Sequence, residues 1–496
     1  MIYIITVFYY LKIMLVLQSK DTFIRTTDKY GYILNQKTKL ERMYNETGVD
    51  YLNILARKPI HVESIIREKI LPLYSNATFE EIYDDFCNFI EDLRNNGFVF
   101  IGSNLDEVLY NEKVWYDNLY LIGNSSFSQH VNQDVNLSTQ EMALDFAKEN
   151  NYLMSLQFEL TSRCNERCIH CYIPNKKKDN GIDLPFRLFK KAIDQFSEMG
   201  GLQVSLSGGE IFLHRDILDM IKYCREKDMQ ISLLSNLISL NKEQVKIIKE
   251  ANVSMVQTSL YSMDEKIHDS ITQVKGSYTK TRNAIELLVK ERIPVMISCP
   301  LMKANANSYH NILQYAHSLG IKAQTDFILM AKEDLDTTNL NNRISLSETE
   351  NVIKEILLNA GVDSVDSISD NTQPSKVLLK LSQPVCAAGI TNLCINANGN
   401  IFPCNGWQGF KAGNLYKESL NQIWETSDSL KELRSITRAS FVECVDCEAK
   451  DYCSICMARN YNESNGNHLK INTELCKIAH LNKKVHEEIL GNNVIN

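Results

Sequence analysis

The sequence predicts an α/β fold, with a winged-helix-like domain before the α/β core and a cysteine-rich domain after it. Three observations support this prediction. Between residues 153 and 335, apolar strand patterns alternate with amphipathic helical patterns, which indicates a parallel sheet. Residues 20–115 combine short strand patterns with three helical patterns. The last 111 residues contain eight cysteines among short, glycine-punctuated segments.

The length and composition are those of a multidomain globular protein. A chain of 496 residues is long enough for about three domains. Apolar residues make up 44% of the chain and charged residues 23%, as in ordinary globular proteins. The 53 basic and 61 acidic side chains give a formal charge of −8. This balance argues against general nucleic-acid binding, so we expect no nucleic-acid partner.

Cysteine is unusually frequent, with 14 residues, of which 11 fall into two groups. Grouped cysteines indicate either disulfides or metal, and disulfide frameworks belong mainly to small secreted domains. Here more than 150 residues of ordinary sequence precede the first group, and the lone Cys87, Cys224 and Cys299 lie within helix- or strand-like patterns. The sequence therefore predicts a cytoplasmic protein with metal or iron–sulfur sites.

Residues 1–17 are apolar except for Thr6 and Lys12. The segment lacks the basic start and the cleavage site of a signal peptide, and it is short and interrupted for a membrane span. We interpret it as a mis-assigned start, with Met14 as the true first residue, or as an apolar strand. A membrane anchor is the alternative, and we expect no membrane attachment.

The first domain is expected to begin with two strands and to continue with three helices. The strands are 22–27 and 30–35, and the helical patterns lie near 47–57, 61–73 and 79–96. Asn96 and Gly97 then give a helix stop before the strand 98–102. A polar linker at 123–136 precedes a helix opened by Ser138.

The core is expected to contain six parallel strands separated by helices, as an open sheet or a partial barrel. The strand candidates are 154–160, 202–207, 230–235, 255–260, 295–300 and 324–329. The clearest helical patterns lie at 185–198, 214–227, 279–291, 308–318 and 346–360. Because such folds place their chemistry at the carboxyl ends of the strands, we look for functional residues there.

The first strand runs directly into Cys164, Cys168 and Cys171, which have the spacing C-x3-C-x2-C. Three thiolates on one loop can hold three irons of a [4Fe–4S] cluster, whose usual ligands are four cysteines. The fourth iron would then be open to a substrate or cofactor. A zinc site is the alternative, with His170 as the nearby fourth ligand.

The second strand ends in Gly208, Gly209 and Glu210. Glycines allow a ligand to approach the backbone, and the carboxylate can accept a hydrogen bond from an amine. With the cysteine loop one strand earlier, the sequence resembles the radical S-adenosylmethionine (SAM) superfamily. The resemblance implies a partial (β/α)6 barrel over about 153–335, and a cluster that chelates SAM and cleaves it to a 5′-deoxyadenosyl radical.

The resemblance also implies further SAM contacts at strand ends. Glu210 would meet the methionine amine, and Ser235 and Asn236 would face the ribose. Ser259 occupies the polar position on the fourth strand, and Thr272 stands where some relatives carry an arginine for the SAM carboxylate. Ordinary capping of strand ends is the alternative role for Ser235, Asn236 and Ser259.

The C-terminal cysteines resemble the SPASM domain, the auxiliary-cluster module of radical SAM peptide modifiers. Asn398 and Gly399 give the turn of its hairpin. The pattern departs from the family at Cys453-x2-Cys456, where three residues usually intervene. The resemblance implies two auxiliary [4Fe–4S] clusters, making three in all. Their ligands would be Cys386, Cys394, Cys404 and Cys456 for the inner cluster, and Cys444, Cys447, Cys453 and Cys476 for the outer one. A pair of zinc sites is the alternative.

Residues 20–115 resemble the PqqD-like leader-recognition domain of ribosomal peptide maturases. A precursor's leader would add a strand to the edge of the small sheet. A structural cap is the alternative. The predicted domain boundaries are 20–115 for leader recognition, 116–150 for a linker and helix, 151–340 for the radical SAM core, 341–385 for a bridging region and 386–496 for the SPASM domain.

The leading hypothesis is a radical SAM maturase that binds a precursor peptide and joins a cysteine sulfur to a carbon as a thioether. It implies an external electron donor such as flavodoxin or ferredoxin. Carbon–carbon or carbon–oxygen crosslinking is the second hypothesis. Sulfatase maturation is disfavoured because Asn405 stands where that group carries an acidic residue. A zinc-binding peptide scaffold is the non-enzymatic alternative. The sequence identifies no catalytic base.

Overall fold

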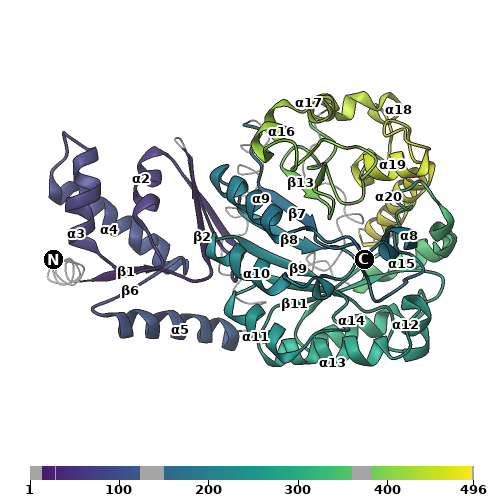
Figure 1. Cartoon of the computed structure of the whole chain (residues 1–496), viewed down its shortest axis with the longest axis horizontal. Coiled ribbons are helices and arrows are strands. Elements are labelled where there is room, and N and C mark those ends of the chain that lie inside the picture. The colour runs from purple at the N-terminus through teal and green to yellow at the C-terminus, as the bar shows by residue number, and fades with distance from the viewer. Residues whose placement is uncertain (1–13, 28–29, 123–149, 360–380, 494–496) are drawn as a thin grey trace. The chain divides into compact units, whose positions relative to one another are not determined.

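The computed structural model describes residues 14–27, 30–122, 150–359 and 381–493 (Figure 1). The chain divides into two compact units, residues 1–152 and residues 153–496. The predicted linker at 123–136, the helix opened by Ser138 and the Ser/Asp-rich connection after residue 360 lie outside the described residues. None of the helices within the described ranges is both long enough and apolar enough to cross a membrane.

The first unit contains two three-stranded antiparallel sheets. One has β1 (Leu15–Gln18) between β5 (Ile60–His61) and β6 (Val99–Gly102). The other follows the chain order, with β2 (Thr22–Thr26), β3 (Gly31–Asn35) and β4 (Leu40–Tyr44). The described end of the apolar N-terminal segment is therefore an internal strand, in which Val16 is fully buried. Strand β4 was not predicted from the sequence.

Helices cover these sheets. They are α2 (Glu46–Ile54), α3 (Val62–Ile65), α4 (Phe79–Asn95) and α5 (Leu105–Ile122), and a π-helix and a 3-10 turn continue α3 to Leu73. A capping box between Thr78 and Glu81 starts α4. Its buried face follows the predicted helical spacing and includes Ile82, Phe86 and Ile90. Helix α5 begins before the predicted boundary at residue 115 and continues beyond it.

The six predicted parallel strands of the core are present and lie in chain order. They are β7 (Ser155–Glu159), β8 (Gln203–Ser207), β9 (Gln230–Leu234), β10 (Met255–Ser259), β11 (Val295–Pro300) and β12 (Lys322–Asp326). Every neighbouring pair is parallel. The sequence prediction of a parallel α/β core is thus confirmed, although β12 begins and ends earlier than expected.

Helices connect these strands, as parallel pairing requires. They are α8 (Asn175–Asp179), α9 (Phe186–Glu198), α10 (Ile217–Glu226), α11 (Lys242–Glu250), α12 (Glu265–Thr272), α13 (Ser277–Lys290) and α14 (Tyr309–Ser318), followed by α15 (Leu346–Asn359). The strands bury Phe158, Leu206, Leu233 and Ile297 completely against them. The short helices α11 and α12 were not among the predicted helices.

The C-terminal region extends the same sheet. Strand β13 (Asn392–Ile395) pairs in parallel with β7, and β14 (Asn400–Phe402) and β15 (Gly413–Asn414) follow as antiparallel neighbours. Gly399 has φ +70° at the predicted hairpin turn, a conformation that glycine adopts without strain. Because β13 lies beside β7, the cysteine hairpin is attached directly to the strand that leads into the first cysteine loop.

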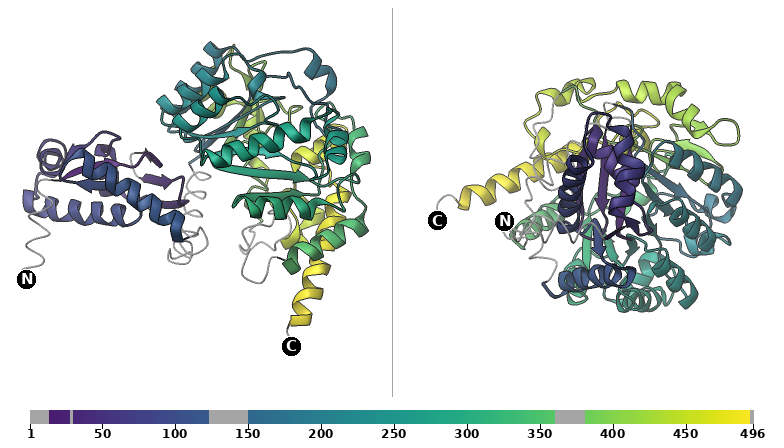
Figure 2. Two further views of the ribbon diagram at one scale, coloured as in Figure 1. Left: turned by 90° about the horizontal axis from the view of Figure 1, so that it is seen from below. Right: turned by 90° about the vertical axis from the view of Figure 1, so that its left-hand side faces the viewer.

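Five helices complete the second unit: α16 (Leu420–Thr426), α17 (Asp428–Ser435), α18 (Val442–Val445), α19 (Met457–Glu463) and α20 (Thr473–Asn493). Helix α20 packs against α15, and its end projects from the unit (Figure 2). One continuous hydrophobic core runs from the barrel strands to Trp407 and Trp424. The regions predicted as core, bridge and cysteine-rich domain therefore share one compact unit.

Candidate active site

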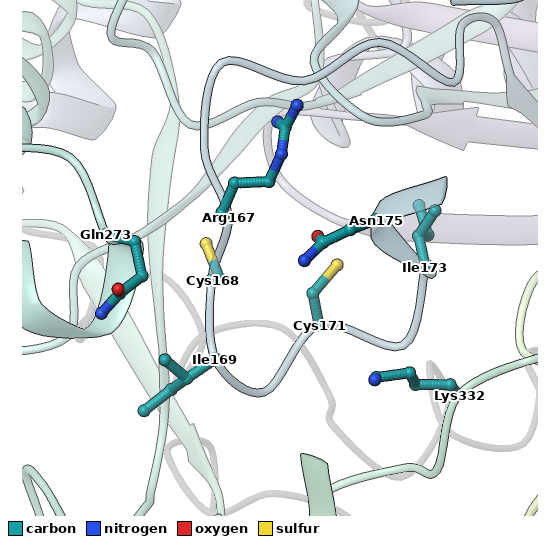
Figure 3. A pocket seen from close by; sticks show the side chains of 8 residues that line it. All are labelled: Arg167, Cys168, Ile169, Cys171, Ile173, Asn175, Gln273 and Lys332. Atoms are coloured by element: carbon teal, nitrogen blue, oxygen red, sulfur yellow. The ribbon is translucent and has the colours of Figure 1, made fainter. Parts of the chain in front are cut away.

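The three-cysteine loop follows β7 and is held in place by the end of α12. The backbone N–H groups of Arg167 and Ile169 donate to the carbonyls of Thr272 and Ile271, each at 3.0 Å. The loop borders a cavity of about 510 Å3 (Figure 3). Its lining residues are Arg167, Cys168, Ile169, Cys171, Ile173, Asn175, Gln273 and Lys332. Cys168 and Cys171 thus border a space that could hold a cofactor, at the strand end where the sequence placed it.

Buried ionisable groups surround the three thiols. Lys178 is only 3% exposed. Burial lowers the pKa of its ammonium group, but the sulfurs of Cys171, Cys164 and Cys168 raise this pKa by more, so the net shift is upward. Burial also raises the pKa of Glu166 to about 7, and this carboxylate accepts a 3.2 Å hydrogen bond from the Cys168 thiol. The loop therefore combines soft sulfur ligands with one buried cation, a donor set that fits an iron–sulfur cluster.

His170, the alternative zinc ligand, is buried against Tyr261, with ring centroids 5.1 Å apart. Burial and the nearby Lys178 ammonium lower its pKa to about 4. The ring is thus neutral at physiological pH, and its Nδ1 atom has no hydrogen-bond partner among the described residues. Within those residues, no three His, Cys, Asp or Glu side chains converge closely enough to hold a single metal ion.

Glu210 connects the ends of β8 and β9. Its Oε1 atom accepts hydrogen bonds from Ser235 Oγ at 2.7 Å and from the Phe212 backbone N–H at 3.0 Å, and Oε2 accepts from the Asn236 N–H at 2.7 Å. Burial raises the pKa of this carboxyl. The Asn236 side chain in turn donates to Asn165, beside Cys164. Three predicted SAM-binding residues and the cysteine loop are therefore brought together.

The two remaining predicted SAM contacts lie on other elements. Ser259 ends β10, and its side chain interacts with the Tyr261 hydroxyl. Thr272 is fully buried at the end of α12, and its hydroxyl shares a 2.7 Å hydrogen bond with Ser277. The described role of Thr272 is to hold the cysteine loop through its carbonyl. A contact between Thr272 and the SAM carboxylate remains a prediction.

The close approach that Gly208 and Gly209 permit is made by the backbone of the chain itself. A Cβ atom on Gly208, whose φ is +147°, would lie 2.6 Å from the Thr161 carbonyl oxygen. A Cβ atom on Gly209 would lie 2.2 Å from the carbonyl oxygen of Arg163, the residue before Cys164. Both glycines are therefore needed so that the second strand end can pack against the backbone of the cysteine loop.

The eight C-terminal thiols interact in two groups. In one group, burial raises the pKa of the Cys404 thiol, and electrostatic interactions with Cys456 and Cys386 raise it further. Cys404 in turn contributes to the raised pKa of Cys394. In the other group, Cys453 interacts in this way with Cys476, Cys444 and Cys447. The two groups have the same membership as the predicted inner and outer ligand sets, and the ligand assignment itself remains a prediction.

Two side chains near these thiols were not identified from the sequence. The Arg438 guanidinium lies near Cys453, Cys444 and Cys386, and so near members of both groups. Its Nε atom is buried without a hydrogen-bond partner among the described residues. His480 Nε2 lies 4.0 Å from Cys447 Sγ. The i, i+4 spacing of Cys476 and His480 on α20 could have suggested the second of these contacts.

A buried polar network joins the barrel to the C-terminal region. The Tyr172 hydroxyl donates to Glu159 at 3.0 Å and accepts from Asn405 at 3.1 Å. Gln408 donates to the other Glu159 oxygen and accepts from Lys177 at 2.7 Å. Asn405, which replaces the acidic residue of sulfatase-maturing enzymes, is thus a hydrogen-bond donor in this network. Local sequence patterns carried no signal for it.

The Lys177 ammonium interacts with two buried carboxylates in this network. It forms a 2.7 Å ion pair with Glu333, whose side chain is 7% exposed, and it also interacts electrostatically with Glu159. Burial nevertheless raises the pKa of Glu333 to about 7, because one shared ammonium does not offset the loss of water. The other oxygen of Glu333 has no hydrogen-bond partner within the described structure.

We predict that Gly209→Ala lowers the iron content of the anaerobically reconstituted protein, because the new Cβ would displace the backbone before Cys164. Gly320→Ala is the control. Gly320 has a positive φ, of +66°, but its Cβ would meet nothing within 4 Å, so we expect a cost of about 1 kcal/mol in stability from the backbone conformation and no loss of iron. Iron analysis and thermal unfolding measure both effects. Equal iron in the two variants would contradict the close-approach argument.

We predict that Glu333→Gln stabilises the protein increasingly as the pH rises. Folding raises the pKa of the Glu333 carboxyl to about 7. As the pH rises from the unfolded pKa to this value, the unfolded chain loses the proton more readily than the folded chain, so the free energy of unfolding falls. The full loss of stability is reached above pH 7. The expected gain at pH 8 is on the order of 1–3 kcal/mol relative to pH 5. Thermal unfolding across this range measures it, with the exposed neighbour Asp334→Asn as the control. A pH-independent difference would refute it.

Two family models match the chain. Residues 158–316 match the radical SAM superfamily model, and residues 386–457 match the SPASM model, described as an iron–sulfur cluster-binding domain. These matches cover the core from the end of β7 through β11 and into α14, and the cysteine region from Cys386 to Met457. Both family resemblances inferred from the cysteine and glycine motifs are thereby confirmed.

Curated relatives include three different enzymes. The antilisterial bacteriocin subtilosin biosynthesis protein AlbA of Bacillus subtilis is 27% identical over 383 residues, which cover 74% of this chain and 80% of AlbA. The AdoMet-dependent heme synthase of Methanosarcina barkeri is 24% identical, covering 62% of this chain and 91% of the synthase. The PqqA peptide cyclase of Methylocella silvestris is 23% identical, covering 60% and 80%.

Solved structures share the fold. Streptococcus suis SuiB bound to S-adenosylmethionine aligns with a TM-score of 0.58 at 16% identity, covering 93% of this chain and 99% of SuiB. The structure of anSMEcpe with bound AdoMet aligns with a TM-score of 0.53 at 16% identity, covering 69% of this chain and 100% of anSMEcpe. Together with the cysteine loop, the Gly-Gly-Glu turn and the cysteine hairpin beside β7, the two family models show a radical SAM domain followed by a SPASM domain in this chain.

Proposed function

We propose that this protein is a peptide maturase that installs an oxidative crosslink in a ribosomally made precursor, joining a cysteine sulfur to a carbon as a thioether. The observation that carries the proposal is the pairing of β7 with β13, which attaches the three-cysteine loop and the eight-cysteine region to neighbouring strands. Among the relatives, AlbA is a subtilosin biosynthesis protein and another is a PqqA peptide cyclase. SuiB has been solved with its precursor peptide SuiA.

Cys164, Cys168 and Cys171 would hold the SAM-binding cluster. When bound, that cluster supplies the electron that cleaves SAM to a 5′-deoxyadenosyl radical. The chain itself provides the acceptor oxygens of Glu210, which Ser235 and Asn236 already orient by hydrogen bonds. Burial of the carboxyl excludes water from these hydrogen bonds and strengthens them. A SAM amine could share this acceptor, as the Gly-Gly-Glu resemblance implies.

The eight C-terminal cysteines would hold two auxiliary clusters, for three clusters in all. Thioether formation removes one hydrogen from carbon and one from sulfur. One hydrogen leaves as an atom, and the other leaves as a proton and an electron, so the reaction needs an electron acceptor. Auxiliary clusters would supply this capacity, and an external flavodoxin- or ferredoxin-type donor would supply the electron for SAM cleavage.

The first unit would bind the leader of the precursor. Within the described residues, β2 and β4 are the outer strands of the sheet β2–β3–β4. An extended peptide can add a strand at the edge of a sheet through main-chain hydrogen bonds, and side-chain pockets add specificity. This arrangement supports the PqqD-like, leader-recognition interpretation of residues 20–115.

Carbon–carbon crosslinking is the second candidate, because a PqqA peptide cyclase is among the relatives. The two products differ in their free thiols. Both lose two hydrogens per crosslink, but only the thioether consumes a cysteine thiol of the peptide. Alkylation with iodoacetamide before mass spectrometry therefore separates the two reactions.

We predict that co-expression with the precursor yields a peptide lighter by two hydrogens per crosslink, with one alkylatable thiol lost each time. Cys168→Ala should abolish both this product and 5′-deoxyadenosine formation, whereas Cys444→Ala should retain some 5′-deoxyadenosine and lose the crosslink. Cys224→Ala, at a buried lone cysteine outside all three sets, is the control and should retain both activities. Wild-type protein that forms no 5′-deoxyadenosine when reduced would refute the enzymatic proposal.

We predict that the full-length precursor slows backbone hydrogen exchange at β2 or β4, because main-chain hydrogen bonds to an added strand protect the edge amides. Hydrogen–deuterium exchange with mass spectrometry measures this protection. A precursor lacking its leader is the control and should leave both strands unprotected. Protection confined to residues 153–496 would assign peptide binding to the second unit alone.

A further inference from the structure

We infer that Lys178 is the fixed counter-charge of the SAM-binding cluster and that its ammonium group raises the reduction potential of that cluster. The inference rests on the radical SAM family assignment and does not depend on which bond the enzyme forms. Lys178 would then change the reduction potential of the cluster from a position beside the ligands, without being a ligand itself.

Three consecutive lysines on α8 have three different environments. Lys176 is exposed to solvent. Lys177 is half-buried and pairs with Glu333 and Gln408. Lys178 is 3% exposed and lies beside the cysteine loop. A lysine is almost never buried so completely unless an anionic partner compensates the loss of hydration.

The largest electrostatic partners of Lys178 are the cluster cysteines, and Glu166 interacts with it as well. Among the described residues, no carboxylate lies within 4.0 Å of its ammonium nitrogen in an ion pair, although such pairs are present for both Lys177 and Arg167. The interactions that favour its charged form come first from Cys171, then from Cys164 and Cys168. The burial of Lys178 is therefore explained by the sulfurs of the loop, which become thiolates when they bind iron.

Of the cations near the loop in the described structure, Lys178 is the most deeply buried. The His170 side chain packs its ring against Tyr261, with centroids 5.1 Å apart. Arg167 is 39% exposed and pairs with Asp179 at 2.7 Å. Of the two carboxyls nearest the loop, Glu166 accepts a hydrogen bond from the Cys168 thiol, and Glu210 accepts hydrogen bonds from Ser235 and Asn236. Lys332, which lines the same cavity as Cys168 and Cys171, is 24% exposed and pairs with Asp336 at 2.6 Å.

The effect on the cluster follows from charge. A [4Fe–4S] core with two positive charges and three thiolate ligands carries a net charge of about −1, and reduction makes it about −2. A nearby buried cation stabilises the reduced form more than the oxidised form, because the attraction grows with the negative charge and is weakly screened in the interior. Lys178 should therefore raise the potential and make the cluster easier for an external donor to reduce.

The test is an EPR-monitored potentiometric reduction of the reconstituted full-length protein without SAM and without peptide. The signal of the SAM-binding cluster is identified by its absence in Cys168→Ala. Lys178→Met, which removes the charge at similar length, should shift the midpoint potential of this signal to a more negative value. Lys178→Arg should stay close to the wild type. Lys176→Met, a charge removal on the exposed side of the same helix, should leave the potential unchanged.

An unchanged potential in Lys178→Met would overturn the inference. If SAM affinity alone fell while the potential stayed constant, Lys178 would be a ligand of the SAM carboxylate instead. If Lys178→Met and Lys178→Gln failed to assemble the cluster while Lys178→Arg assembled it, the site would require a cation, as inferred. Failure of all three variants would assign Lys178 a packing role and refute the counter-charge. Because no peptide is present, failure of the proposed crosslinking reaction would not affect these outcomes.

Discussion

The parallel pairing of β13 with β7 is the constraint on which the arrangement of the second unit depends. It aligns Asn392 with Ser155 and Ile395 with Phe158, so two segments more than 200 residues apart in sequence become neighbouring strands. Strand β7 continues into the first cysteine loop, and β13 carries Cys394 and opens the hairpin that ends at Cys404. Adjacent strands lie about 4.8 Å apart, and their backbone hydrogen bonds leave little freedom to slide. The relative positions of the cysteine loop and hairpin are therefore set by a sheet.

Side chains reinforce this pairing at the end of β7. Glu159 is the last residue of the strand, and it binds Tyr172 from the cysteine loop and Gln408 from the segment after Cys404. Each partner is buried or half-buried, so removal of one member would leave unsatisfied polar groups at a cost of about 1–3 kcal/mol. The network thus couples the position of the loop to that of the cysteine hairpin. Such coupling is useful where cofactor sites must keep a constant separation during electron transfer.

Local patterns were sufficient to predict elements with a strong period or a specific motif. The six barrel strands, helix α4 and the Asn398–Gly399 turn were found because alternation, helical spacing and turn chemistry are local properties. Strand β4 and helices α5, α11 and α12 were missed because they are short or carry mixed exposure; in α5, for example, Leu109 and Tyr110 are exposed apolar residues. The cysteine groups were visible as motifs, but the β7–β13 pairing, Glu159 and Gln408 were not. Those contacts depend on which distant segments meet, and no local pattern encodes this.

The run Lys176–Lys177–Lys178 shows why the electrostatics of the site also required a structure. In the sequence, three lysines in a row indicate a solvated, charged helix face. In the fold, successive residues of the short helix α8 point in different directions, and only Lys176 remains in solvent. The other two compensate buried negative charge, Lys177 between Glu159 and Glu333 and Lys178 beside the thiols. Net charge and composition cannot separate these roles.

Buried cations beside the cysteines address a general cost of assembling a cluster inside a protein. Burial raises the pKa of Cys164 to about 11, that of Cys386 to about 11 and that of Cys453 to about 12. These thiols are therefore protonated before metal binds, and cluster assembly must remove the protons. A fixed positive charge lowers that cost by stabilising each thiolate as it forms. Lys178 is placed to do so for the first loop, and Arg438, between Cys386 and Cys453, for both C-terminal groups. Positive charge at these positions thus favours the ligand state that iron requires, before any cofactor chemistry begins.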